Sequence, residues 1–189
     1  MYSKSTSLNK FNSKNFSNYF SGIVAFENRN NSEALKFLNL SKILINQHNP
    51  YLKRYVTSLV LEKKVSQAIN VIKDNKNKEN INFFDAHLLL ILDNLKKDNF
   101  KKAYENVNNA FKFEEQDRLD AAILETLKQY IFVFKEKKLL KEKKNFGNLS
   151  FIAETFQRCY LDDIKTDNYF FNLINKNDAD YTRYIYFYL

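Results

Sequence analysis

The feature that most constrains the fold is an alanine that recurs about every 34 residues. Ala34, Ala68 and Ala103 are separated by 34 and then 35 residues, and each follows an apolar stretch and a short polar turn. A period of this length is typical of a helix-turn-helix solenoid. An aliphatic residue stands four places after each alanine, at Leu38, Ile72 and Val107.

Backbone breakers are scarce, which favours helices throughout. The 189 residues include 2 Gly and 1 Pro, whereas folds rich in β-structure need many turns. We therefore predict an all-α chain, built as an array of antiparallel helix pairs. Pro50 falls at a repeat boundary, where Asn49 is expected to cap a helix and the proline to take its first position.

Three segments follow from the pattern. Residues 1–15 are polar and lack the apolar stretch of a signal peptide, so we expect a disordered lead-in. Residues 16–113 hold three helical hairpins, and residues 114–189 hold degenerate helical repeats. The expected helices are 16–27, one starting at Ser32, 50–62, 66–73, 82–97, 99–111, 114–144 as one helix or a pair, 149–162, 167–174 and 179–189.

The third segment has two further features. One apolar stripe keeps a helical period, and the charged run 135–144 is expected to be a solvated helix end, with an interaction tail as the alternative. The aromatic stretch 181–189 suggests a fragment of a longer repeat protein, with docking to a partner or second copy, or folding back as a cap, left open. The stripe consists of Leu119, Ala122, Ile123, Leu127, Tyr130, Ile131 and Phe134.

These residues resemble the tetratricopeptide-repeat family, in which small side chains let the two helices of a repeat cross closely. The chain departs from the family pattern at Val56 and Ile91, which replace a small residue, and at Asn94, which replaces a tyrosine. The matching positions are Gly22, Ala34, Leu38 and Ser41 in the first repeat, Leu52, Tyr55, Leu59, Ala68 and Ile72 in the second, and Leu90, Phe100, Ala103, Val107 and Ala110 in the third.

The resemblance implies a right-handed superhelical array of antiparallel helix pairs. It also implies a scaffold that binds another protein on its concave face, without catalysis. Of the positions that clamp a carboxylate in some family members, only Arg54 is cationic here, so no such clamp is expected. Leu88 and Leu92 share this face but are expected to be core. The candidate partner-binding residues are Tyr19, Ile23, Phe26, Lys53, Arg54 and Thr57.

Charge leaves a second function open. The formal net charge is +8, and only five of the 30 basic residues are arginine. We interpret the lysines as compositional bias on solvated faces, because nucleic-acid surfaces usually use arginine for bidentate contacts. A nucleic-acid-associated protein is the alternative, and a structural subunit that self-assembles through 181–189 is another.

No catalytic residue, cofactor or metal site is predicted. His48 and His87 have no Cys or carboxylate partners at metal-ligand spacing, and two glycines are too few for a phosphate-binding loop. Cys159 is expected to be buried. No stretch is long and apolar enough to span a membrane, and we expect a cytoplasmic protein.

Overall fold

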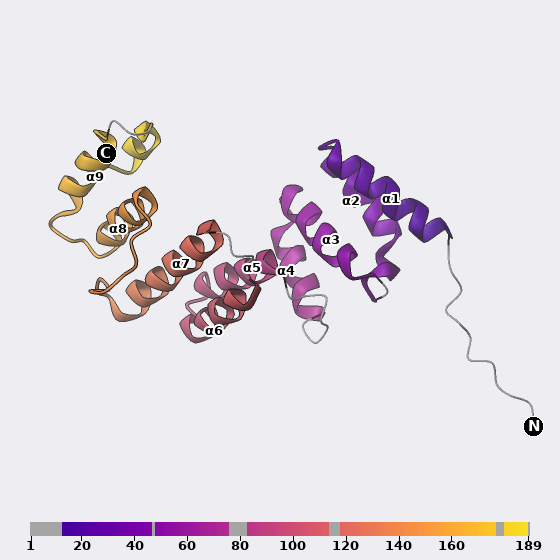
Figure 1. The fold of residues 1–189 in the computed structure, drawn as a ribbon, viewed down its shortest axis with the longest axis horizontal. Coiled ribbons are helices and arrows are strands. Elements are labelled where there is room, and N and C mark those ends of the chain that lie inside the picture. Colours follow the sequence, from indigo (N-terminus) through magenta and orange to yellow (C-terminus); the bar gives the residue numbers. More distant parts are fainter. Residues whose placement is uncertain (1–12, 47, 76–82, 114–117, 177–179, 189) are drawn as a thin grey trace, which may run out of the picture. The chain divides into compact units, whose positions relative to one another are not determined.

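The computed structural model describes residues 13–46, 48–75, 83–113, 118–176 and 180–188 (Figure 1), and in these ranges all regular structure is helical. The predicted all-α class is confirmed, and helices adjacent in sequence pack in pairs. Short 3₁₀ turns span Lys42–Asn46, Phe111–Phe113 and Thr182–Tyr184. The α-helices are α1 (Ser13–Glu27), α2 (Asn31–Leu40), α3 (Asn49–Leu61), α4 (Val65–Asp74), α5 (Phe84–Leu95), α6 (Phe100–Ala110), α7 (Arg118–Glu136), α8 (Asn148–Tyr160), α9 (Thr166–Ile174) and α10 (Ile185–Tyr188).

The chain divides into two compact units, residues 1–86 and 87–189, and the boundary falls within α5. The sequence-based division at residue 113 concerns repeats rather than compact units and stays a prediction. The predicted lead-in 1–15 lies outside the described residues up to residue 12. Its last three residues already belong to α1, which begins at Ser13.

One turn geometry recurs in the first three hairpins. Arg29, Lys63 and Asp98 have φ angles of 59°, 59° and 53°, and they are spaced by the same 34 and 35 residues as the alanines. In each turn the next residue donates its N–H to a carbonyl five residues earlier, at 2.8–2.9 Å. This is the Schellman arrangement, which ends a helix on a left-handed residue. The α8–α9 turn repeats it at Asp162, with φ 51°.

The recurring alanines lie where the second helix of each hairpin is most deeply buried. Ala34, Ala68 and Ala103 are 0% exposed, and so are the aliphatic residues four places on. The next position of the pattern is also buried in each hairpin and is filled by Ser41, Asn75 or Ala110. The spacing found in the sequence is therefore the spacing of the buried contacts.

The two helices of the first hairpin, α1 and α2, approach closely at Gly22. A Cβ added to Gly22 would lie 3.1 Å from Leu38 Cγ and 3.4 Å from the Leu38 backbone nitrogen. Val56 occupies the equivalent position in the second hairpin and Ile91 in the third, and both are buried. The position is therefore buried in all three hairpins, although its side chain differs in size.

The N-terminal caps of three helices differ from those predicted. Asn30, not Ser32, caps α2, and its side chain accepts a hydrogen bond from the Glu33 N–H at 3.3 Å. Likewise, Asn99 caps α6 rather than lying inside it. The cap of α3 is His48, so Pro50 stands at the second helical position, where its missing N–H still costs nothing.

The helix α7 ends earlier than predicted. Lys137 has φ 52°, and its N–H donates to the Val133 carbonyl at 2.9 Å, which closes the helix at Glu136. The run 137–144 is therefore not a helix end but a non-helical segment. Gly147, in the gap between the helices expected at 114–144 and 149–162, has φ 64° and directly precedes α8.

The aromatic C-terminal stretch also differs from the prediction. In place of a helix over 179–189, of which 179 and 189 lie outside the described residues, there is a 3₁₀ turn followed by the four-residue α10. Tyr181 is buried, and the Phe187 ring packs edge-on against Phe156, with centroids 5.1 Å apart. This stretch folds back on α8, which is one of the two readings left open beside the fragment.

We expect Gly22→Val to lower the free energy of unfolding by about 2 kcal/mol, because the added Cβ and its two methyl groups must displace Leu38. In a Leu38→Ala background the same substitution should cost less, since the cavity accepts the methyl groups. Chemical denaturation of the four proteins measures this coupling. Equal costs in both backgrounds would contradict the close crossing.

We expect Lys63→Gly to raise the free energy of unfolding by about 0.5 kcal/mol, because glycine adopts the left-handed conformation without strain. Lys63→Ala removes the same charge and side-chain stem but keeps the strain, so it should give no increase. Thermal or urea unfolding compares the two variants. An equal stabilisation by alanine would show that the backbone conformation is not the cause.

Candidate partner-binding surfaces

The predicted binding face on the first unit is mostly used for packing. Tyr19 is only 2% exposed. Its hydroxyl accepts a hydrogen bond from Arg54 Nη1 at 3.0 Å and lies 3.2 Å from His48 Nε2. The His48 and Tyr19 rings meet edge-on, with centroids 4.9 Å apart. This cluster joins α1 to the start of α3.

Tyr51 continues the same aromatic cluster into the core. Its ring lies 5.7 Å from those of Tyr19 and Tyr55, and its hydroxyl donates to the Leu38 carbonyl. Burial, followed by the electrostatic influence of Tyr55, raises the pKa of Tyr51 well above its ordinary value. Tyr55 in turn donates to Asn39 Oδ1 at 2.7 Å. The tyrosines therefore tie α3 to α1 and α2.

The remaining candidates are not gathered into one site. Ile23, Phe26 and Thr57 are half-buried, and Lys53 is exposed. The Thr57 hydroxyl donates to the Lys53 carbonyl of its own helix at 2.9 Å. Of the six candidates, the described contacts join Tyr19 to Arg54 across helices. Their role in partner binding stays a prediction.

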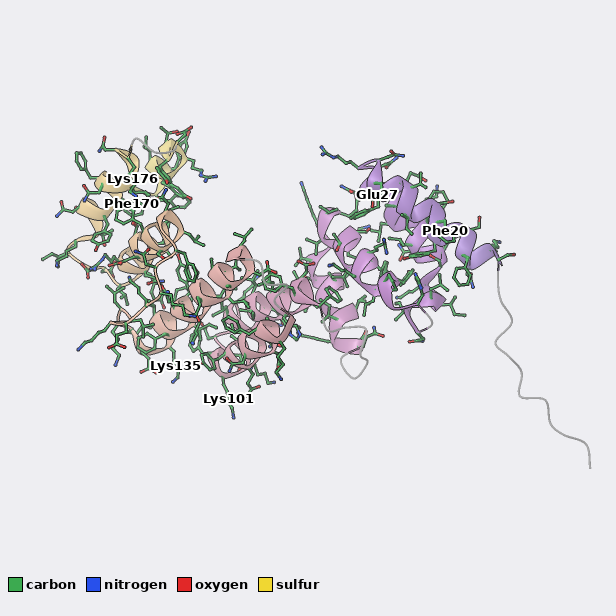
Figure 2. The ribbon with its side chains drawn as sticks, viewed as in Figure 1. Phe20, Glu27, Lys101, Lys135, Phe170 and Lys176 are labelled. Carbon is green, nitrogen blue, oxygen red and sulfur yellow. The ribbon has the colours of Figure 1, made fainter. Side chains whose placement is uncertain are left out.

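An apolar groove lies elsewhere, between α6 and α7 in the second unit. It encloses about 750 Å³. We call the charged residues of its lining the rim of the groove; Figure 2 labels two of them, Lys101 on α6 and Lys135 on α7. Its apolar lining consists of Phe100, Tyr104, Ile131, Phe132 and Leu140, and its polar lining of Lys101, Glu105, Lys128, Lys135 and Glu136.

The groove follows from the faces that the two helices present. On α6, Phe100 and Tyr104 are four residues apart, which makes them neighbours on the helix surface. On α7, the lining residues run from Lys128 to Glu136 at spacings of three and four, which covers about 12 Å of helix. Tyr104 is 41% exposed. The walls are two helix faces, open to solvent, each with aromatic side chains.

The charges around the groove are incompletely paired. Lys135 Nζ lies 2.7 Å from Glu136 Oε1, and this hydrogen bond lowers the pKa of Glu136. Lys138 lies over the Phe132 ring, 5.8 Å from its centroid. Within the described residues, Lys101 and Lys128 have no carboxylate within 4 Å. Two uncompensated ammonium groups therefore border an apolar surface.

Several lysines of the run 135–144 hold the non-helical segment in place. Lys143 forms an ion pair with Glu154 of α8, and Lys144 lies 3.6 Å from Glu125 of α7. Glu154 also forms an ion pair with Arg158, whose Nη2 lies 2.6 Å from Glu154 Oε1. Burial acts to raise the pKa of Glu154, but hydrogen bonds from these two cations outweigh it and hold that pKa below its ordinary value. Not all of the run is free surface charge.

Two sequence expectations about burial are wrong. Cys159 is exposed near the end of α8 instead of buried. Leu92 is 53% exposed, although it was expected in the core, and Leu88 is half-buried.

The searched residues give no group of three His, Cys, Asp or Glu side chains that could hold a metal ion. Among the helices described here, none is long and apolar enough to cross a membrane. Burial lowers the pKa of His87, with smaller and opposing influences from Asn106 and Lys112.

Comparison with known proteins adds no assignment. No protein-family model matches the chain, and searches of curated proteins and of solved structures find no similar protein.

The His48 cluster predicts a pH-dependent stability. Burial and the Arg54 charge hold the pKa of His48 below 6.5 in the folded chain. The unfolded chain then binds more protons just below pH 6.5, so the free energy of unfolding falls on acidification through that range. We expect His48→Gln to reduce this fall, with His87 accounting for part of the remainder. Denaturant titrations at about pH 7 and pH 5 measure it, and an unchanged fall in the variant would contradict the account.

Proposed function

We propose that this protein is a non-enzymatic interaction module. Its helical hairpins, of tetratricopeptide type and stacked as a right-handed array, present a groove that binds a segment of a partner protein. The observation that carries the proposal is the open apolar groove between α6 and α7. Accessible apolar surface of this kind commonly marks a binding site on a soluble protein.

The exposure of their aromatic side chains favours the α6–α7 groove over the α1–α3 face as the binding site. Tyr19 is the most central of the sequence-based candidates, but its side chain is already packed against α3. Tyr104, in contrast, combines a large aromatic surface with 41% exposure. Tyrosines in such positions are frequent anchors of protein interfaces. The proposal therefore rests on the α6–α7 groove rather than on the α1–α3 face.

The recurrent hairpins support the repeat part of the proposal. Three hairpins share one turn geometry, one buried alanine and one buried aliphatic position at a constant spacing. Repeat scaffolds of this kind commonly serve as binding surfaces. Because fold alone does not specify function, the groove and not the repeat carries the functional argument.

Association with nucleic acid and self-assembly through 181–189 stay as alternative hypotheses. The first predicts binding that weakens steeply with salt, because phosphate contacts release counterions. The second would need aromatic side chains of 181–189 to be available to another copy, whereas the rings of Tyr181 and Phe187 already pack within their own chain.

A peptide library tests the proposal directly. We expect the full chain to select peptides that Tyr104→Glu no longer binds, because the substitution places a charge in the apolar groove. Phe171→Glu is the matched control, since Phe171 is exposed on α9 and lies outside the groove lining. Binding measured by fluorescence anisotropy should fall at least tenfold for the first variant and stay within twofold for the control.

Two outcomes would contradict the proposal. One is that no library peptide binds the chain. The other is that selected peptides bind both variants as well as the original protein, which would place the binding surface elsewhere. Thermal unfolding of each variant confirms that the helices remain folded.

A further inference from the structure

We propose that the occupant of the α6–α7 groove is an amphipathic helix of a partner protein whose polar flanks are acidic. The inference rests on the proposed function and specifies the partner at the same site. It is argued from the shape of the groove, the spacing of its apolar side chains and the charges along its rim.

The shape of the groove fits a third helix. Its two walls are helix faces, with lining residues at intervals of three and four along α7 and of four along α6. Packing of helices places side-chain ridges of one helix into grooves formed at these spacings on another. The α7 wall extends about 12 Å, which matches two turns of a helical ligand. Such a ligand would place apolar side chains at i, i+4 and i+7 against the lining.

The apolar lining supplies places for these anchors. Ile131 is 3% exposed and forms the floor, whereas Tyr104 is exposed at one wall. Leu140, from the non-helical segment after α7, also lines the groove. Aromatic and aliphatic side chains together make a surface suited to Leu or Phe anchors.

The charges along the rim of the groove favour acidic rather than basic flanking residues on the ligand helix. Lys135 and Glu136 neutralise each other as an ion pair. What remains on the lining is Lys101 and Lys128 against one carboxylate, Glu105. Lys128 is half-buried, so its ammonium group benefits more from a counter-charge than a fully solvated lysine does.

The segment beyond the rim adds to this positive surplus. Lys138 lies over the Phe132 ring, which is part of the groove lining, and the exposed Lys141 follows Leu140. Glu142 is the one carboxylate in the run 137–144. Acidic side chains on the ligand would therefore meet positive charge on both the α6 side and the 137–144 side, which favours association and fixes orientation.

Two adjacent lysines on α6 provide a matched pair of variants. Lys101 lines the groove, whereas Lys102 does not, and both are exposed in the first turn of the helix. A glutamate at either position interacts favourably with the helix N-terminus, so both variants should remain folded. They change the net charge of the chain by the same amount, and they differ in which face of α6 receives the change.

The probes are two labelled peptides of about 16 residues, long enough for four helical turns. They have the same leucines at i, i+4 and i+7 and differ in having glutamates or lysines at the flanking polar positions. Fluorescence anisotropy with the full chain at about 0.15 M salt measures both affinities. We expect the acidic peptide to bind at least tenfold more tightly than its basic twin. We expect Lys101→Glu to weaken it about fivefold, and Lys102→Glu to change it less than twofold.

The inference is overturned if the basic twin binds equally well or better, if neither peptide binds, or if both lysine variants weaken binding equally. The last result would indicate an effect of net charge rather than of the groove. A peptide with neutral flanks serves to separate the two proposals. If it binds as tightly as the acidic peptide, and Tyr104→Glu abolishes that binding, the acidic partner is wrong while the proposed function stands.

Discussion

The structure depends on how closely the two helices of each hairpin can cross. Alanines that are 0% exposed allow this approach, and the left-handed residue in the preceding turn reverses the chain at the required point. The two constraints share one period because the turn residue precedes its alanine by five positions each time, as in Lys63 and Ala68. A change in that interval would rotate the second helix and move its apolar face out of the core.

The fourth hairpin, α8–α9, shows what happens when only one constraint is kept. Asp162 preserves the turn, but Asp167 stands five residues later in place of alanine, and α9 is held instead by Phe170 and Leu173. The preceding connection is held by ion pairs, with Lys143 joined to Glu154. Helix α7 packs against both α6 and α8, and the groove lies on its α6 side.

The sequence was sufficient for the helical class, the repeat spacing and the buried alanines, because these depend on local period and residue size. Helix caps were displaced by one or two residues, since Ser32 and Asn30 are both acceptable caps and only the turn decides between them. The stripe on α7 was only partly correct: Leu119 is 59% exposed, whereas Leu124 and Val133 are buried. Which faces of α6 and α7 form the groove depends on tertiary packing, although the i, i+4 pair Phe100 and Tyr104 gave a local signal for it.

The central claim is that partner binding occurs in the groove between α6 and α7 of an otherwise intact helical-hairpin protein. Hydrogen exchange of the full chain, measured with and without a bound library peptide, tests it most directly because protection reports where backbone opening is suppressed. The account predicts added protection in 100–105 and 128–140, with little change in α1 and α3. Protection centred on Tyr19 and Arg54, with none between α6 and α7, would contradict it.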